Sequence, residues 1–426
     1  MTGWLTRISG AAISALVTGV AIANVASAQI IPTPEATIPE RQSVLQRPHP
    51  EYDALGIRAG SFLILPSADV IESWDSNIYA TPTRDSTDMV TTVQPQVGVQ
   101  SDWNNHALNF FIGDQSKIYA SHGTENVNNL TAAAQGRLDV LRDVYFTGGG
   151  GYQLNHEDRS SPNATVSGKF PTETHLVDGN LGFVHETGKI GLRLNSAVDS
   201  YSYNNNVTNT GSVIQEKYRD YISYSFVPRL SYEIVPGYSA FVQTPVNEHQ
   251  YVSRDLQGFS HSSHGYEGDA GVALHLASAV NGEIFGGYLR QEFEDHHLSN
   301  AQGIGGGANL LWNVTDLTSL RLAVSRTVQE TDVVGASSYL ETTGKLAVEH
   351  ELLPNVLLTA SGTYFVDSFK GLNRSDNNYN AYAGVKYLMN RTLSVGFEAN
   401  YWHRDSNTPG VNYDREIIGL RLRAQL

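Results

Sequence analysis

The sequence contains no cysteine and only 3 methionines among its 426 residues. The absence of cysteine excludes disulfides, thiolate zinc sites and cysteine nucleophiles, and it excludes a lipoprotein anchor because no thiol can be acylated. Long apolar runs are equally scarce. Beyond the first 28 residues, no stretch reaches the 18 or more apolar residues that a spanning helix needs. If the mature chain enters a membrane, it must therefore do so as a closed β-barrel.

Positive charge is also in short supply, since 28 Lys and Arg face 43 Asp and Glu and leave a net charge of −15. A chain this acidic is a poor partner for nucleic acid or anionic lipid. Glycine (39) and tyrosine (22) are abundant and the mean hydropathy is only −0.27. A soluble β-sandwich could share this composition, so the lengths of the predicted strands must distinguish the two.

The first 28 residues have the three parts of a secretory signal peptide. A single cation, Arg7, precedes an apolar stretch over residues 8–25, and Ala26 and Ala28 flank Ser27. This order predicts a signal peptide over residues 1–28 that is cleaved after Ala28. The alternative is an uncleaved anchor helix, which the polar residues within the apolar stretch and the cleavage signature disfavour.

Residues 29–59 are punctuated by proline, at Pro32, Pro34, Pro39, Pro48 and Pro50. Proline breaks helices and removes ladder hydrogen bonds, so the pattern predicts a periplasmic tail of irregular or polyproline-like backbone. Such a tail could fold back to plug a lumen or could dock a partner, and the sequence does not choose between the two.

Residues 60–426 alternate between apolar and polar positions in segments long enough to cross a bilayer at a tilt, for which about 9–11 residues suffice. In residues 190–194, Ile190, Leu192 and Leu194 alternate with Gly191 and Arg193. Residues 319–325 and 393–402 repeat the pattern, and so does the last strand, which ends at residue 426. The predicted class is an all-β, transmembrane, antiparallel up-and-down β-barrel.

Short turns and long loops alternate strictly along this region, as they do in bacterial outer-membrane barrels. Eight short turns are spaced about one hairpin apart, at residues 104–105, 141–143, 187–188, 235–237, 278–281, 313–316, 353–355 and 390–391. Eight turns make nine hairpins, hence about 18 strands (16 to 20) with both ends in the periplasm. A barrel of 16–18 strands leaves an aqueous channel, and the polar face of each strand is expected to line it.

Several segments resemble a known family. They are RPHPEYDALGIRAGSF at 47–62, DSNIYA at 75–80, SDWNNHAL at 101–108, GRLD at 136–139 and the run from Tyr152 to Arg159. In these segments the chain is similar to the beta-barrel porin type 2 family of outer-membrane proteins. The resemblance implies an outer-membrane barrel. Some members of the family sit beside exopolysaccharide synthesis and export genes, which makes polysaccharide export one candidate role. No catalytic residue is inherited.

The predicted function is an outer-membrane, porin-like channel with a polar lumen, a candidate conduit for exopolysaccharide. The alternative is a plugged structural or interaction barrel that anchors an envelope assembly. We expect no cofactor and no enzymatic activity, although a rim-active enzyme remains a minority hypothesis. The expected partners are outer-membrane lipid, the barrel assembly machinery and periplasmic polysaccharide export components, and no nucleic acid.

Strand parity selects candidate residues for the lumen wall, where charged rows set ion selectivity. An inward-facing aromatic such as Tyr201, Tyr203 or Trp402 could also stack on sugar rings. The candidates are Arg193, Tyr288, Arg290, Glu292, Arg321, Glu398, Trp402, Arg421 and Arg423.

Four histidines form the most concrete local cluster. His261 and His264 precede the turn at residues 278–281, and His296 and His297 follow it. Pairing across this turn is expected to set His264 near Asp295 and His261 near Leu298. Imidazole and carboxylate groups at this spacing are candidate metal ligands at the outer rim. The blander interpretation is that they are solvated histidines at loop ends.

Overall fold

The computed structural model describes residues 42–83, 86–165, 167–276 and 279–426, so the predicted signal peptide (residues 1–28) lies outside the described residues. Apart from three short 3₁₀ turns, the regular structure in this part of the chain is β-strand. No helix there is long and apolar enough to cross a membrane, a result that does not bear on strands. The 3₁₀ turns are η4 (Val44–Gln46), η5 (Gly123–Glu125) and η6 (Lys217–Arg219).

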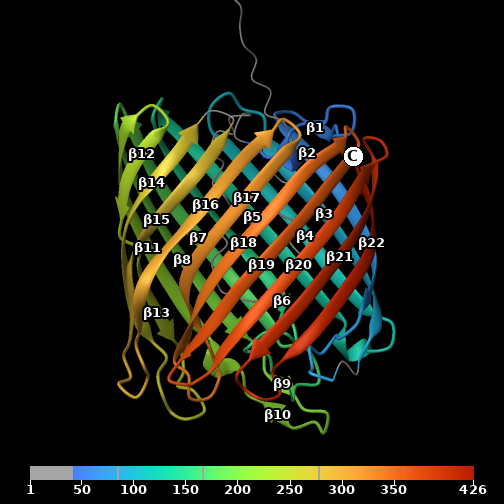
Figure 1. Ribbon diagram of the computed structural model, residues 1–426, viewed down its shortest axis with the longest axis vertical. Helices are drawn as coiled ribbons and strands as arrows, with labels where there is room; N and C mark the ends of the chain where they lie inside the picture. The colour runs from blue at the N-terminus through green and yellow to red at the C-terminus, as the bar shows by residue number, and fades with distance from the viewer. Residues whose placement is uncertain (1–41, 84–85, 166, 277–278) are drawn as a thin grey trace, which may run out of the picture.

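Long antiparallel strands form one closed wall (Figure 1). The strands are β1 (Ile57–Ala59), β2 (Phe62–Asp75), β3 (Asp88–Ser101), β4 (Ala107–Tyr119), β5 (Val127–Leu141), β6 (Val144–His156), β7 (Glu173–Thr187), β8 (Ile190–Tyr203), β9 (Asn206–Val207), β10 (Val213–Ile214), β11 (Tyr221–Val235), β12 (Tyr238–Gln243), β13 (Val246–Tyr251), β14 (Ser263–Leu276), β15 (Val280–Phe293), β16 (Ala301–Thr315), β17 (Thr318–Glu330), β18 (Ser338–Leu353), β19 (Val356–Lys370), β20 (Ser375–Leu388), β21 (Leu393–Ser406) and β22 (Tyr413–Gln425).

The wall closes where β22 pairs with β2, from Asp75 opposite Ile417 to Ser67 opposite Gln425. β12 and β13 are two parts of one wall strand, because β11 and β14 each pair with both. The break between them contains Pro245, which has no backbone N–H to give to the ladder. β9 and β10 pair with each other in a separate two-stranded sheet, and the three-residue β1 pairs only with the start of β2. Within the described residues the wall therefore has 18 strands, which confirms the predicted fold class and strand number.

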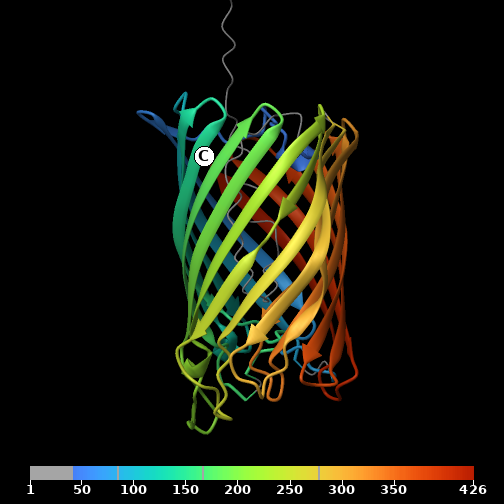
Figure 2. The same cartoon turned by 90° about the vertical axis from the view of Figure 1, so that its left-hand side faces the viewer.

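All eight predicted short turns fall where consecutive wall strands meet, although residues 277–278 of one of them lie outside the described residues. The longer loops gather at the opposite end. Among them, residues 204–220 include the β9–β10 hairpin, which projects beyond the lower rim in Figures 1 and 2. Because short turns are periplasmic in such barrels, the end that carries the C-terminus faces the periplasm and the loop end faces outward.

Alternation divides each strand between two environments, as β22 illustrates. Ile418, Leu420 and Leu422 point outward, and their side chains are 42%, 60% and 49% exposed on the outer surface. Arg421 and Arg423 point the other way and bond to Asp69 of β2. An apolar outer face suits lipid and a polar inner face suits water, which is why the sequence alternates with period two.

Candidate functional site

The lumen wall at the closing seam is a network of charges. Asp69 is fully buried and accepts hydrogen bonds from Arg421 Nη1 (3.4 Å) and Arg423 Nη1 (3.0 Å). Arg421 also donates to Glu398 on β21 (3.3 Å). One acid on β2 thus holds two neighbouring cations of β22, which would otherwise repel each other.

The other predicted wall residues on the inner face also have partners. Arg321 lies 2.9 Å from Glu349 on β18, and Arg193 lies 2.6 Å from Glu186 on β7. Trp402 is 6% exposed and packs with Phe365 and Tyr413 on the inner face near the loop end. Trp402 therefore belongs to a packed cluster.

The predicted lumenal position of Tyr288, Arg290 and Glu292 was wrong. On β15 these residues share the outward face with Ile284, and Tyr288 is directly opposite Ile304, which is 73% exposed. The inward positions of β15 are a mixture of apolar and polar residues, which includes buried Leu289, Gln291 and Phe293. Arg290 pairs with Glu292 on the outer surface, at 2.6 Å.

Replacing Asp69 with asparagine (Asp69→Asn) is expected to lower the thermal stability of the barrel. Arg421 and Arg423 would lose their shared counter-charge at the seam, and hydrogen bonds to charged groups contribute about 1.5–3 kcal/mol. Heat-modifiability on a denaturing gel measures the change. Glu72→Gln, on the outer face of the same strand, is the matched control; equal melting of the two variants would contradict the role given to Asp69.

Residues 157–165 and 167–172, here called the mouth loop, connect β6 to β7 but reach the far side of the barrel. Asp158 accepts a hydrogen bond from Arg415 of β22 (3.0 Å), and the Ser160 carbonyl accepts one from Arg404 of β21 (2.8 Å). Asn163 Nδ2 donates to the carbonyl of Glu330 at the end of β17 (3.3 Å). Six wall strands separate β7 from β17 by the shorter route, so the loop lies across the extracellular opening.

Neighbouring loops hold the mouth loop from the other side. Arg159 donates two hydrogen bonds to Glu125 (2.9 and 2.8 Å). Arg219, in the loop of residues 204–220, pairs with three acids: Glu157 of the mouth loop, Glu216 (3.1 Å) and Asp332 (3.5 Å). The Arg219 side chain is only 6% exposed, so these charges interact in a poorly hydrated environment where each pairing matters.

Burial and charge act in opposite directions on the acids of this network. Burial raises the pKa of Glu157 and of Asp332, and the Arg219 guanidinium opposes the rise without cancelling it. For Asp158, burial also favours the protonated form, but the Arg415 charge outweighs it and holds the pKa well below its usual range. Asp158 therefore stays ionised in its ion pair with Arg415. Around Arg219, by contrast, three acids share one cation.

Residues 42–54, here called the strap, lie inside the opposite, periplasmic mouth. The backbone N–H of Val44 donates to Ser319 Oγ (2.9 Å), and Arg321 donates to Ser43 Oγ (2.8 Å). The Val44 side chain is fully buried, and the Leu45 N–H reaches Glu349 (3.3 Å). This end of the strap is attached to β17 and β18.

The other end of the strap is attached near the closing seam. Arg391 donates to the Pro50 carbonyl (3.0 Å), and Gln425 Nε2 donates to the Tyr52 carbonyl (3.2 Å). Three wall strands separate β18 from β22, so the strap spans a chord of the periplasmic opening. Residues 42–54 of the predicted tail thus lie inside the barrel mouth, whereas Ile57–Ala59 are exposed and pair with β2.

The four predicted histidines do not form one cluster. The register pairs His264 with Glu292 and not with Asp295, so the partner lies three residues from the predicted one. His264 lies on the outer face, whereas His261 is buried beside Asp255 (3.1 Å). His261 and His264 therefore do not join His296 and His297 in one set of candidate metal ligands at the rim.

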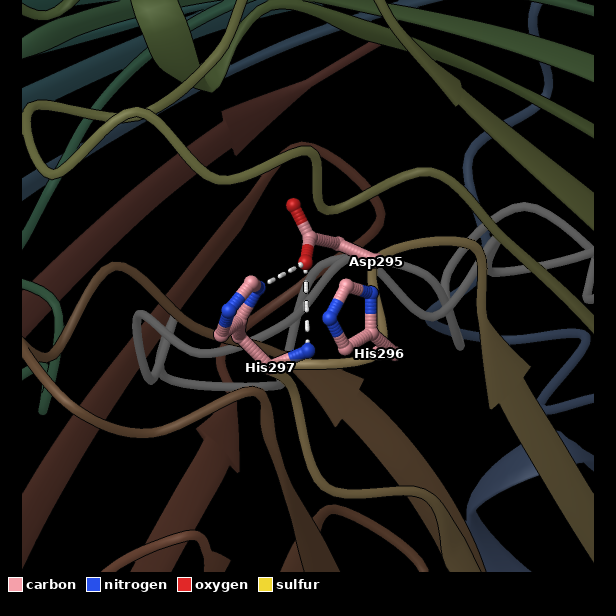
Figure 3. A group of neighbouring side chains, drawn as sticks. All are labelled: Asp295, His296 and His297. Carbon is pink, nitrogen blue, oxygen red and sulfur yellow. Dashed lines mark hydrogen bonds and ion pairs between the residues drawn. The ribbon is translucent and has the colours of Figure 1, made fainter.

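His296 and His297 do lie together, with Asp295 (Figure 3). These three are the single group in the described part of the chain whose ligand atoms all lie within 4.8 Å. However, Asp295 Oδ1 already accepts hydrogen bonds from the backbone N–H (3.1 Å) and the ring Nδ1 (2.9 Å) of His297. These bonds hold the pKa of Asp295 low, at about 2. The arrangement is a hydrogen-bonded turn.

The residues that hold the mouth loop, above all Arg219, Arg404 and Arg415, escaped the sequence interpretation. Their partners lie far along the chain, as with Arg415 and Asp158. One signal was available, because Glu157, Asp158 and Arg159 form a run of charges inside a family-like segment. Consecutive charges directly after a strand that ends at the outer rim point to contacts more specific than solvation.

The fold and the polar lumen define an outer-membrane β-barrel of the porin type. The family described as "Putative beta-barrel porin 2" matches residues 49–426, and the chain belongs to this family. This confirms the resemblance seen in the sequence.

Solved outer-membrane receptors match the chain at low similarity. A ferric enterobactin receptor mutant from Pseudomonas aeruginosa, in complex with enterobactin, is 6% identical with a TM-score of 0.47, over 88% of this chain and 82% of that chain. The siderophore receptor PiuA from Acinetobacter baumannii is 8% identical with a TM-score of 0.43, over 87% and 82%. None of the curated proteins compared with the chain matches it. These likenesses say nothing about the solute.

Proposed function

We propose that the protein is a gated outer-membrane channel for hydrophilic solutes, and that an exported, uncharged polysaccharide is its substrate. The observation that carries the proposal is a polar lumen wall whose two mouths are each crossed by a segment held through hydrogen bonds and ion pairs. Room inside comes from small inward residues on β16 and β17, including Gly305, Gly307, Ala323 and Ser325. The role is transport without catalysis or cofactor.

Delivery and partners belong to the same proposal. The signal peptide is removed after Ala28, the barrel assembly machinery inserts the chain among outer-membrane lipids, and the Pro-rich tail of residues 29–59 meets periplasmic polysaccharide export components. The strap, residues 42–54 of that tail, lies in the periplasmic mouth, so a partner that binds the tail could pull the strap out of it.

The second candidate is a permanently plugged barrel that anchors an envelope assembly. The packing at the extracellular mouth favours it, since Arg219 and Arg415 are nearly inaccessible beneath the loops. The two candidates differ in whether the mouth loop ever leaves its site.

Single-channel conductance of the mature chain (residues 29–426) in planar bilayers tests the proposal. Conductance that oligosaccharides block supports a polysaccharide conduit, and conductance indifferent to oligosaccharides reduces the role to a general porin. Silence in the native chain and in variants that release the mouth loop and the strap would favour the plugged barrel.

The channel is expected to prefer cations. Asp178 and Asp199 oppose each other directly on β7 and β8, and no cation in the described ranges forms an ion pair with either. Rings of carboxylates attract cations. The reversal potential in a salt gradient should show this preference, and Asp178→Asn with Asp199→Asn should reduce the cation-to-anion permeability ratio roughly twofold. Glu248→Gln, on the outer face, should leave the ratio unchanged; an equal change in both would contradict the prediction.

A further inference from the structure

Two carboxylates on the inner face of β14 lie side by side without a counter-charge. Glu267 and Asp269 are two residues apart on one strand, so their side chains share a face. Glu267 Oε1 and Asp269 Oδ1 are both buried, and no donor group of the described residues reaches either oxygen. Asp269 is only 5% exposed. Its other oxygen, Oδ2, accepts a hydrogen bond from Gln243 Nε2 (2.9 Å), which fixes the orientation in which Oδ1 is presented.

A pair of glycines makes the space that these oxygens occupy. Gly287 of β15 and Gly305 of β16 are directly opposite each other. A Cβ atom on Gly287 would lie 2.4 Å from Asp269 Oδ1, and one on Gly305 would lie 2.1 Å from Glu267 Oε1. Both distances are shorter than real Cβ contacts, so only glycine leaves room here. Cβ positions of directly opposed residues lie about 4.5–5.5 Å apart, so the two oxygens lie close together above this pair of glycines.

The surrounding charges do not neutralise the pair. Glu283, also on the inner face of β15, is compensated by Arg229 at 2.7 Å. No ion pair of this kind reaches Glu267 or Asp269 among the described residues. Two adjacent, poorly hydrated carboxylates are stable only if they share a proton or bind a cation. Because the two oxygens fill the volume that side chains at Gly287 and Gly305 would take, the glycines let two unpaired carboxylates approach each other, and their mutual repulsion favours a bound cation.

We propose that Glu267 and Asp269 bind a divalent cation at the lumen wall, with Ca²⁺ as the ion of choice. Carboxylate oxygens are hard ligands of the kind that Ca²⁺ prefers. Glu267 Oε1 and Asp269 Oδ1 supply the two protein ligands. The site is separate from the Asp295, His296 and His297 group and independent of which solute the channel carries.

Equilibrium dialysis of the refolded mature barrel against radioactive calcium tests the proposal. We expect one site with a Kd on the order of 10⁻⁴–10⁻³ M, the range of open extracellular sites. Glu267→Gln and Asp269→Asn should each weaken binding about tenfold or more, because each removes an anionic ligand. Glu398→Gln is the matched control: it removes a lumenal acid that already has a cation partner, Arg421, and should leave calcium binding unchanged.

Gly305→Ala provides a test that alters no charge. Its added methyl group meets the far end of the flexible Glu267 side chain, so the barrel can fold while the carboxylate is displaced. We expect this variant to lose calcium affinity to a similar degree. Native affinity in Gly305→Ala, or no calcium binding in the native chain, would overturn the proposal. So would an infrared carboxylic-acid band that vanishes in Asp269→Asn and is unaffected by calcium, because it would show that the pair shares a proton.

Discussion

Replacing Arg219 with methionine (Arg219→Met) is expected to release the mouth loop from the extracellular opening and to raise the conductance several-fold. Methionine keeps much of the length and apolar volume of the arginine stem but removes the charge. Glu157, Glu216 and Asp332 would then face one another with no cation among them. Removing one partner of a buried ion pair costs about 3–5 kcal/mol, which exceeds what the remaining contacts of a surface loop usually supply.

Limited proteolysis and conductance measure this release together. Cleavage within residues 157–172 should become rapid, while the wall, whose ladder does not involve Arg219, should stay intact. The defect should shrink as the pH is lowered, since protonation of Glu157 and Asp332 removes their part of the mutual repulsion. This direction of the pH dependence follows from the raised pKa of Glu157 and of Asp332, because acids with a raised pKa take up protons at a higher pH than ordinary carboxyl groups.

Arg254→Met is the matched control for Arg219→Met. Arg254 is an outer-loop arginine whose side chain is 67% exposed and whose partner, Asp295, lies 3.7 Å away. Exposed pairs of this kind contribute little. If Arg219→Met retained native protease resistance and conductance, or if Arg254→Met matched its effect, Arg219 could not be the residue that holds the mouth loop.

The wall of the barrel could be predicted because its determinants are local. Each strand must present lipid-compatible residues at every second position, and each short turn needs turn-forming residues at one place in the chain. The turn at Pro354 and Asn355, for example, joins β18 and β19 where the sequence predicts it. Counting turns gives the number of strands without any knowledge of long-range contacts, and this is why the prediction of 18 strands was confirmed.

The orientation of β15 was mispredicted because the two environments change along the strand. Near its outer end the inner face is covered by packed loops, so Leu289 and Phe293 are buried there. The outer face at the same level carries Arg290 and Glu292, as expected where a strand leaves the hydrocarbon for water. The assumption that polar residues always face the lumen holds at mid-membrane and reverses at this rim.

The contacts of the mouth loop could not be predicted, because they join residues that are distant in sequence. Asp158 and Arg415 are 257 residues apart, and Asn163 is 167 residues from Glu330. Loop composition does not distinguish a solvated loop from one that crosses an opening. The family-like segments did contain the decisive residues, since residues 47–62 hold part of the strap and residues 152–159 hold Glu157, Asp158 and Arg159.

Introducing a charge at the end of the strap that is attached to β17 and β18 (Val44→Asp) is expected to expel the strap from the periplasmic mouth. The Val44 side chain is completely buried against the inner wall, and its backbone N–H donates to Ser319 Oγ. An aspartate there would be desolvated beside the wall acid Glu349, with no new cation to pair it. An isolated buried charge costs several kcal/mol, more than the few hydrogen bonds along residues 42–54 can offset.

Leu55→Asp separates this effect from a general effect of charge on the tail. Leu55 directly follows the strap and is 68% exposed, so an aspartate at this position stays hydrated. Val44→Asp should expose residues 42–54 to protease added on the periplasmic side and should raise conductance, whereas Leu55→Asp should behave like the native chain. If Val44→Asp frees the strap without any change in conductance, the extracellular mouth alone limits passage, and the strap serves to position the tail for a periplasmic partner. If the strap stays protected in Val44→Asp, burial of Val44 is not what holds it in the mouth.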